Sequence, residues 1–249
     1  MVGGATTKEL MVDGKRLDGR ALDELRPVKI TASVLNNADG SAYIEWGKNK
    51  VIAGVFGPRP CHPKRMMDPY RAIIKSRYRL APFSTSDHGR AGPNRRSIEL
   101  SKVIREAFES RVLLEQFPQT MIELTVEVLE ADGGTRCASL VAASVALADA
   151  GIPMKDLVSA VAVGKINDQI ALDLTGVEDN YGDSDIPFAL AGRNKELMLF
   201  QMDGVLTKEQ INQALDMGTK ACEKVHQLQV EALKRVYESK KQEVEAKED

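Results

Sequence analysis

The segment from residue 121 to residue 151 places the strongest constraint on the fold. Met121–Glu130 alternates apolar and polar side chains, which is the pattern of a half-buried β-strand. Gly133-Gly134 then interrupts the strand, and Arg136–Ala150 follows as a helix of small residues that ends at Gly151. Because small side chains let a helix approach a sheet closely, the segment predicts a strand followed by a helix packed tightly against a sheet.

Elements of the same two kinds flank this segment. We predict strands at residues 28–34, 41–46, 51–56, 158–163, 169–174 and 197–202. Gly57-Pro58 should end the third of these strands, and residues 61–94, which lack a clean periodicity, should form a long basic loop. Helices are expected at residues 97–116 and after Thr207, which forms a capping-box pattern with Gln210. Strands followed by a helix, twice, predict an α+β fold of two β-α halves, with mixed sheets flanked by helices.

The same pass along the chain predicts its domain organisation. We expect a flexible leader at residues 1–17, a single domain at residues 18–237 and a charged tail at residues 238–249. The first ten residues lack the charged and apolar regions of a signal peptide, and no apolar run approaches the roughly 20 residues that cross a bilayer. The chain is therefore expected to act in the cytoplasm, with no membrane involved.

The cysteines and histidines argue against a disulfide framework and against a zinc site. The three cysteines are far apart in the sequence, and so are the three histidines. A metal ion in this protein should therefore be a hard cation that carboxylates bind.

The net charge of −2 conceals an uneven distribution. Residues 59–105 carry 12 Lys and Arg against 3 Asp and Glu, a local net charge of +9, whereas the rest of the chain carries −11. Such a basic segment can attract a polyanion such as RNA, the alternative being a solvated face that balances acidic neighbours. Only 5% of the residues are aromatic, so an RNA site would depend on arginines more than on stacking.

The first candidate site is the string Ala131-Asp132-Gly133-Gly134-Thr135-Arg136, which leaves a strand and opens a helix. Glycines permit a tight turn, and the amides and dipole at a helix N-terminus attract an anion. Thr135 adds a hydroxyl donor, and Arg136 adds a guanidinium group suited to phosphate oxygens. The string predicts a phosphate pocket, with an ordinary glycine turn and a surface arginine as the alternative.

The second candidate site lies between Glu178 and Asp185, where four acidic residues occur within eight positions. Carboxylates this close repel one another unless a cation or a proton intervenes, so such a cluster often marks a Mg²⁺ site. An acidic surface turn is the alternative.

Two basic strings complete the set of candidates. Arg95-Arg96 stands at the start of a predicted helix, where positive charge is locally unfavourable unless an anion or the acidic cluster compensates for it. Cys61-His62-Pro63-Lys64-Arg65 is a candidate RNA-contacting loop, with a mobile solvated loop as the alternative.

Four ordered strings together resemble the ribonuclease PH family. They are Asp18-Gly19-Arg20 with Glu24-Leu25-Arg26-Pro27, then Asn94–Glu99, then Ala131–Arg136, and finally Glu178-Asp179 with Asp185. Within that family, the tract Tyr78–Ser84 with Gly92-Pro93 is similar to the active ring subunit of archaeal exosomes. The resemblance covers residues 18–237 and implies a ribonuclease PH-like fold, which is of the ribosomal protein S5 domain 2-like type.

The resemblance also implies roles for particular residues. The attacking inorganic phosphate would be bound by Arg96, Gly134, Thr135 and Arg136. Asp179 and Asp185 would be the catalytic carboxylates and would bind Mg²⁺ or Mn²⁺. RNA would be contacted by Arg95 and, at a constriction, by His62, Lys64 and Arg65.

The implied activity is phosphorolytic degradation of single-stranded RNA from 3′ to 5′, which releases nucleoside diphosphates and can run backward to add 3′ tails. The implied partners are a sister ribonuclease PH-like subunit in a hexameric ring and RNA-binding cap subunits. Three alternatives are a non-catalytic RNA-binding ring subunit of the same fold, a stand-alone ribonuclease PH that trims transfer RNA, and a metal-dependent hydrolase that releases monophosphates.

Overall fold

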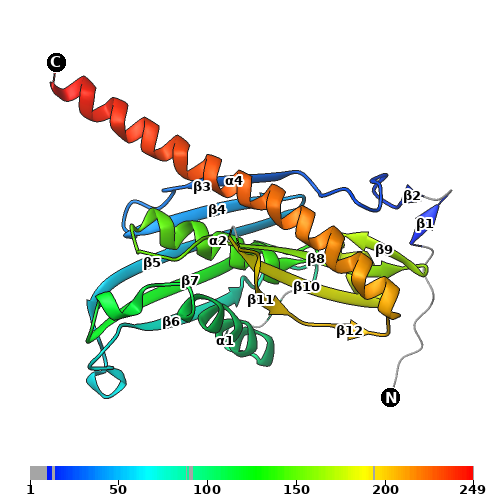
Figure 1. Cartoon of the computed structure of the whole chain (residues 1–249), viewed down its shortest axis with the longest axis horizontal. Helices are drawn as coiled ribbons and strands as arrows, with labels where there is room; N and C mark the ends of the chain where they lie inside the picture. Colours follow the sequence, from blue (N-terminus) through cyan, green and yellow to red (C-terminus); the bar gives the residue numbers. More distant parts are fainter. Residues whose placement is uncertain (1–9, 13–14, 88, 90–91, 193, 249) are drawn as a thin grey trace.

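The computed structural model describes residues 10–12, 15–87, 89, 92–192 and 194–248. The first nine residues of the predicted leader lie outside this set. The described part of the chain has two five-stranded sheets and a small two-stranded one. In Figure 1 the long helix α4 (Lys208–Glu248) runs diagonally across the molecule, and α1 (Arg95–Glu109) lies near its lower edge, beside β6. Among the described residues, no helix combines the length and the apolar character that a membrane span requires.

The first sheet has the strand order β3-β4-β5-β7-β6 and is antiparallel except for the β6–β7 pair. Its strands are β3 (Val28–Ala32), β4 (Gly40–Trp46), β5 (Asn49–Pro60), β6 (Ile73–Leu80) and β7 (Thr120–Glu130). The prediction that Gly57-Pro58 ends β5 was wrong, because pairing with β7 resumes at Arg59 after a register shift.

Strand β6 also corrects the prediction of an unbroken loop over residues 61–94, as does a 3-10 turn at Lys64–Met66. Side chains of β6 alternate, since Ile74 and Tyr78 are buried while Arg77 and Arg79 are exposed. The alternation of apolar and polar residues was present in the sequence. Its polar positions are basic, however, so the strand resembled the basic loop around it.

The second sheet has the order β11-β10-β8-β9, and β12 (Asp203–Gly204) pairs with β10. The predicted hairpin is confirmed as β8 (Val158–Ile166) and β9 (Gln169–Leu172), and β11 (Glu196–Phe200) corresponds to the last predicted strand. Strand β10 (Ser184–Ala191) was not predicted. It is almost completely buried, so it lacks the alternation that marks a half-buried strand.

Helix α2 (Thr135–Asp149) packs against both sheets and supplies twelve buried residues, as its small side chains predicted. The closeness of the contact is clearest at Gly40 of β4, where a Cβ atom would lie 2.2 Å from the amide nitrogen of Ala150. One hydrophobic core joins residues of both sheets with α1, α2 and α4, in agreement with a single packed unit.

Both flanking helices begin at a capping box. Asn94 caps α1, and the Thr207 amide donates to Oε1 of Gln210 at 2.9 Å, which confirms the pattern predicted at the start of α4. The first predicted helix is shorter than expected, since α1 ends at Glu109 and only a 3-10 turn (Leu114–Gln116) follows. In contrast, α4 continues through the predicted charged tail as far as Glu248.

Part of the predicted leader packs against the domain. Met11–Val12 (β1) pairs with Lys15–Arg16 (β2), and the side chain of Arg16 is completely buried. The loop predicted between β6 and α1 includes His88 and Arg90, which lie outside the described residues.

Candidate functional site

The turn before α2 requires both of its glycines. Gly133 and Gly134 have φ angles of 70° and 67°, in the left-handed region where other residues are strained. A Cβ atom at Gly133 would lie 2.6 Å from the carbonyl oxygen of Leu174, so only glycine lets this turn approach the chain that follows β9. The N-terminus of α2 is thereby fixed beside the segment that carries the acidic residues.

Thr135, the first residue of α2, brings two other elements to this N-terminus. Its hydroxyl oxygen accepts hydrogen bonds from the Tyr78 hydroxyl of β6 at 3.2 Å and from Arg96 of α1 at 3.3 Å. With its oxygen used as an acceptor, the Thr135 hydroxyl proton is available for an anion. The structure therefore places the predicted phosphate residues Arg96, Gly134 and Thr135 together.

Arg136 is held from two sides. Its guanidinium group donates to the Gln201 side chain, just after β11, and lies 3.6 Å from a carboxylate oxygen of Glu99. These contacts orient a side chain that would otherwise be mobile, and they keep its charge near the start of α2. Gln201 was not predicted as a site residue.

The two predicted catalytic aspartates lie on different elements. Asp179 belongs to the short helix α3 (Gly176–Tyr181), and Asp185 belongs to β10. Both line a cavity of about 330 Å³, together with Asp183 and Asp203. Four acidic residues therefore line one cavity, but Asp203 lies outside the predicted cluster, and Glu178 of that cluster is not among them.

Electrostatics show that this cavity adjoins the phosphate residues. Burial raises the pKa of Asp179, even though Arg96 and Arg136 act to lower it. Burial, together with repulsion from Asp179, raises the pKa of Asp185 to about 6 against the same two arginines. The two carboxyl groups form an interacting pair that keeps a proton at a pH where an ordinary aspartate is ionised.

Glu178 does not belong to the acidic site, although it lies in the predicted cluster. Its side chain is 1% exposed, and Arg16 of β2 donates to its Oε1 at 2.7 Å. Its other oxygen accepts from the amide and the hydroxyl of Thr175, which caps α3. Glu178 thus anchors the helix that carries Asp179.

A second set of buried contacts ties the two motifs together, and no role was predicted for the side chains that make them, those of Arg26, Asn49 and Asp173. Arg26 forms a two-point ion pair with Asp173, at 2.7 Å and 3.0 Å, and donates to the carbonyl oxygens of Asp132 and Gly133. Asn49 donates to Gly133 at 2.6 Å and accepts from the Asp132 amide. The glycine turn and the chain entering α3 are therefore parts of one hydrogen-bonded unit.

The carboxylates fit a weakly coordinated hard cation better than a closed metal site. No group of three or more His, Cys, Asp or Glu side chains among the described residues is arranged to bind a metal ion. Mg²⁺ commonly uses one or two protein carboxylates and takes its other ligands from phosphates and water. Asp179 and Asp185 meet that requirement.

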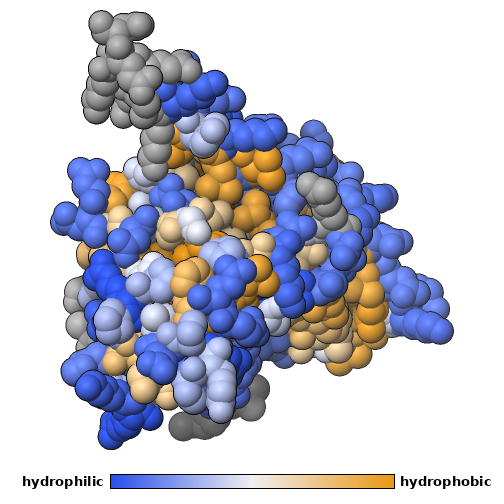
Figure 2. Space-filling view, turned by 60° about the vertical axis from the view of Figure 1, so that its left-hand side comes forward, coloured by the Kyte–Doolittle hydropathy of each residue, from blue (hydrophilic) through white to orange (hydrophobic). Residues whose placement is uncertain are grey.

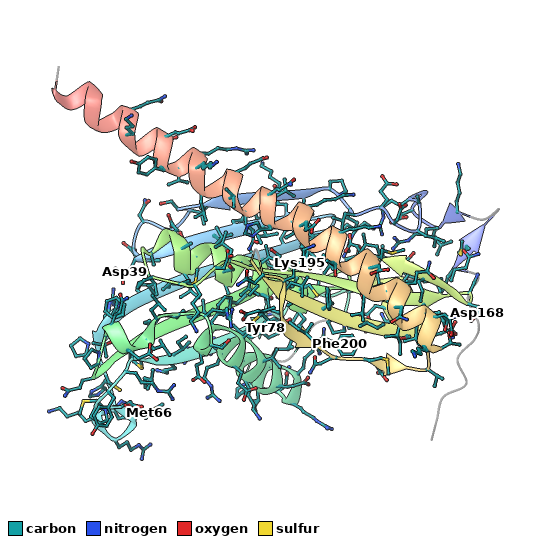
Figure 3. All side chains as sticks on the ribbon, viewed as in Figure 1. Asp39, Met66, Tyr78, Asp168, Lys195 and Phe200 are labelled. Carbon is teal, nitrogen blue, oxygen red and sulfur yellow. The ribbon has the colours of Figure 1, made fainter. Side chains whose placement is uncertain are left out.

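The predicted RNA-contacting residues lie in two places. Arg95 is exposed beside Arg96, whereas His62, Lys64 and Arg65 are exposed around the turn that precedes β6. Figure 3 labels one residue near each place: Met66, which follows the His62–Arg65 loop, at the lower left, and Tyr78, whose hydroxyl reaches Thr135, near the centre of the molecule. The structure does not bring the His62–Arg65 loop into the cluster of phosphate residues and aspartates.

Comparisons with known proteins agree with this arrangement. Residues 24–153 match domain 1 of the 3′ exoribonuclease family, and residues 156–221 match domain 2. The chain is 54% identical to the exosome complex component Rrp41 of Thermococcus kodakarensis over 236 residues, which cover 95% of each chain. It is 55% identical to the exosome complex component Rrp41 of Pyrococcus furiosus, over 95% of this chain and 94% of the relative.

Solved structures confirm the predicted ribonuclease PH-like fold. Rice Rrp46 superposes with a TM-score of 0.80 and 26% identity, over 88% of this chain and all of the other. A chain from the Archaeoglobus fulgidus exosome with RNA bound to the active site gives a TM-score of 0.75 and 25% identity, over 86% and 92% of the two chains. With both family domains matched and relatives above 50% identity, the chain belongs to the ribonuclease PH, or 3′ exoribonuclease, family.

Proposed function

We propose that this protein degrades single-stranded RNA from its 3′ end by phosphorolysis and releases nucleoside diphosphates. One observation carries the proposal. The anion-binding start of α2, with Arg96 beside it, adjoins a carboxyl pair whose raised pKa lets it hold a proton. A site for an attacking phosphate and a source of a proton for the leaving group are the two parts that phosphorolysis needs.

In the proposed reaction, inorganic phosphate binds at the α2 N-terminus through Thr135, Arg136 and Arg96. A phosphate oxygen attacks the phosphorus of the last internucleotide linkage and forms a new P–O bond. The bond from that phosphorus to the 3′ oxygen of the preceding nucleotide breaks, and the oxygen takes a proton from the Asp179–Asp185 pair. The two arginines reduce the repulsion between two anionic reactants, which is a positioning and charge problem more than one of covalent catalysis.

A divalent cation fits the same proposal. Mg²⁺ or Mn²⁺ held by the ionised carboxylate of the Asp179–Asp185 pair, while the other carboxyl keeps the proton, would stabilise negative charge on the departing oxygen. Because one phosphate bond is exchanged for another of similar energy, the reaction should reverse when phosphate is scarce and then add 3′ tails.

Relatives named as exosome complex components support work in an assembly, which we propose is a ring with a sister ribonuclease PH-like subunit. RNA-binding cap subunits and a cytoplasmic location complete the proposal. In Figure 2, hydrophobic residues reach the surface in patches between hydrophilic ones. Large apolar side chains are also exposed at and after β11, namely Leu197, Phe200, Met202 and Val205. Such surface is what a subunit that works in an assembly leaves for its partners.

One assay separates this function from its alternatives. RNA carrying a 3′-terminal label is incubated with the protein, alone and with its sister subunit, in the presence and absence of phosphate. Diphosphate release that requires phosphate is the expected result. Monophosphate release without phosphate would identify a hydrolase, and RNA binding without release in either sample would identify a non-catalytic subunit.

The pH dependence of turnover tests the proton-holding pair. Because the protonated carboxyl is the donor, kcat/KM should decline as pH rises through about 6, the pKa of Asp185. The raised pKa also means that Asp185 adds to stability at low pH, below its ordinary value of 3.8, and that this contribution is lost as pH rises through about 6. Diphosphate release measured from pH 5 to 8 checks the first expectation, and a flat profile would contradict it.

Arg136→Ala tests the phosphate site. Losing one charge-assisted phosphate contact should raise KM for phosphate about tenfold or more, with a smaller effect on KM for RNA. Because Arg136 also lowers the pKa of Asp185, the decline in kcat/KM should move to higher pH in this variant. Arg235→Ala, which removes an arginine from the exposed face of α4, is the matched control. An unchanged KM for phosphate would reject the assignment.

A further inference from the structure

A groove of about 600 Å³ runs between β6 and α1, outside the site described above. Strand β6 is the edge strand of the first sheet. The Tyr78 amide on this edge donates to the Ser101 hydroxyl of α1 at 2.9 Å, and the Ser76 hydroxyl donates to the Ser101 carbonyl oxygen. Helix α1 therefore lies against the middle of the edge, where an added β-strand would have to pair, and this favours a ligand that side chains recognise.

All the charged residues that line this groove are basic. Five of its lining residues are basic and none is acidic: Lys75, Arg77, Arg79, Lys102 and Arg105. Acidic neighbours pair with Lys75, Lys102 and Arg105, but they stand outside the groove. Among the described residues, no carboxylate lies within ion-pair distance of Arg77 or Arg79, which are both exposed. Arg79 has Glu127 as its register neighbour on β7, but the two do not form an ion pair among the described residues. The groove therefore keeps two arginines, Arg77 and Arg79, that no ion pair of the described chain engages.

The basic side chains of β6 are regularly spaced. Lys75, Arg77 and Arg79 occupy alternate positions, so they share one face of the strand and stand about 7 Å apart. An extended single strand can place successive phosphate groups along such a row. A folded protein surface would need acidic side chains at the same intervals.

The lining of the groove includes neighbours of two sites that were already identified. Met66, next to the His62–Arg65 loop, and Ser97, next to Arg96, are both among the residues that line it. Figure 3 shows the separation between Met66 and Tyr78, whose hydroxyl reaches Thr135 of the phosphate site. The groove thus connects the loop predicted to contact RNA with the place where the RNA end would react.

We propose that the β6–α1 groove is the track along which the backbone of single-stranded RNA runs from the His62–Arg65 loop to the phosphate site. The inference rests on the proposed function and adds Arg77 and Arg79 as binding residues that act upstream of the reacting end. Contacts to phosphates alone make the track indifferent to base sequence. Strand β6 has 8 residues and extends about 25 Å, so only RNA longer than the few nucleotides at the reacting end can occupy it.

The test uses the Arg77→Gln/Arg79→Gln double variant, assembled with the sister subunit. Its affinity for a long oligonucleotide, measured by fluorescence anisotropy, should fall several-fold at low salt. The slope of log affinity against log salt concentration should decrease by about 1.4, since each phosphate contact on a single strand contributes about 0.7. KM for an RNA of three or four nucleotides, and kcat on both RNAs, should stay within about twofold.

The matched control removes two other exposed charges from the same sheet, with Lys29→Gln on β3 and Lys48→Gln in the turn between β4 and β5. It should leave affinity for long RNA within about twofold. Unchanged affinity and salt slope in the double variant would overturn the proposal. An equal loss of affinity for short RNA would also overturn it, because it would show damage to the site that binds the reacting end. A loss of sister-subunit assembly in size-exclusion chromatography would overturn it as well, because it would identify the groove as a protein interface. Anisotropy does not depend on turnover, so failure of the phosphorolysis assay leaves this test intact.

Discussion

Asp179→Asn is expected to reduce turnover by roughly 10²–10⁴-fold, the range for loss of a proton-transfer group, while RNA affinity stays within about twofold. Asparagine keeps the size and the polarity of the side chain but can neither donate this proton nor bind a cation as a carboxylate does. The burial that raises the pKa of Asp179 also means that the substitution removes a costly buried charge, so the variant should fold. Single-turnover release of diphosphate and anisotropy with labelled RNA measure the two quantities.

Asp168→Asn is the matched control for this experiment. Asp168 is 85% exposed in the turn between β8 and β9, where it has a φ of 63° that asparagine tolerates well. Turnover should be close to that of the unmodified protein. If Asp179→Asn weakened RNA binding as much as turnover, the catalytic assignment would fail, because the residue would then contribute to substrate binding in general.

Arg16→Met is expected to lower the free energy of unfolding by about 3–5 kcal/mol, the usual cost of removing one partner from a buried ion pair. Arg16 and Glu178 are 0% and 1% exposed, so methionine would leave the Glu178 carboxylate with no opposite charge and no access to water. Urea denaturation at neutral pH measures the loss. A decrease below about 1 kcal/mol would show that the pair contributes little.

The Arg16→Met/Glu178→Met double variant separates the pair from the packing around it. Replacing both charges with apolar groups removes the uncompensated carboxylate, so the double variant should be more stable than Arg16→Met alone. Burial raises the pKa of Glu178, but Arg16 and the Thr175 donors outweigh it and hold the pKa below the ordinary value of 4.5. The pair therefore stabilises the protein above that pH, and the contribution is lost as pH falls further. If the double variant lost as much stability as Arg16→Met and Glu178→Met do together, the two residues would not be coupled.

Several components of the site were accessible from the sequence because each is local. The glycine turn, Thr135 and Arg136 are consecutive, and a strand followed by glycines and a helix has one main structural interpretation. Arg95 and Arg96 were identified as site candidates for a similar local reason, since they stand at a helix start, where negative charge is normally favoured. The structure places Arg96 within hydrogen-bond distance of Thr135, and anion binding by the two residues stays a prediction.

Other components were not accessible because they depend on contacts between distant positions. Arg26 and Asp173 are 147 residues apart, and nothing in their sequence surroundings shows that they form a buried pair. Glu178 and Asp179 are adjacent, yet one anchors a helix to Arg16 and the other faces the cavity. Strand β6 was missed because its exposed side is basic, and β10 because both of its sides are buried.

The sequence by itself determined the α+β class, the small-residue helix and the glycine turn that opens it, because period, glycine and helix-end chemistry act over a few residues. Only the tertiary structure showed that Glu178 is a buried structural partner of Arg16, whereas Asp179 and Asp185, which the family resemblance had named, line the cavity. Burial and the nearest charges set the pKa of each carboxyl group, and both depend on contacts between distant residues. The tertiary structure also decided that the basic residues of β6 line one groove, between β6 and α1. That assignment depends on α1 packing beside the strand, which no local pattern encodes.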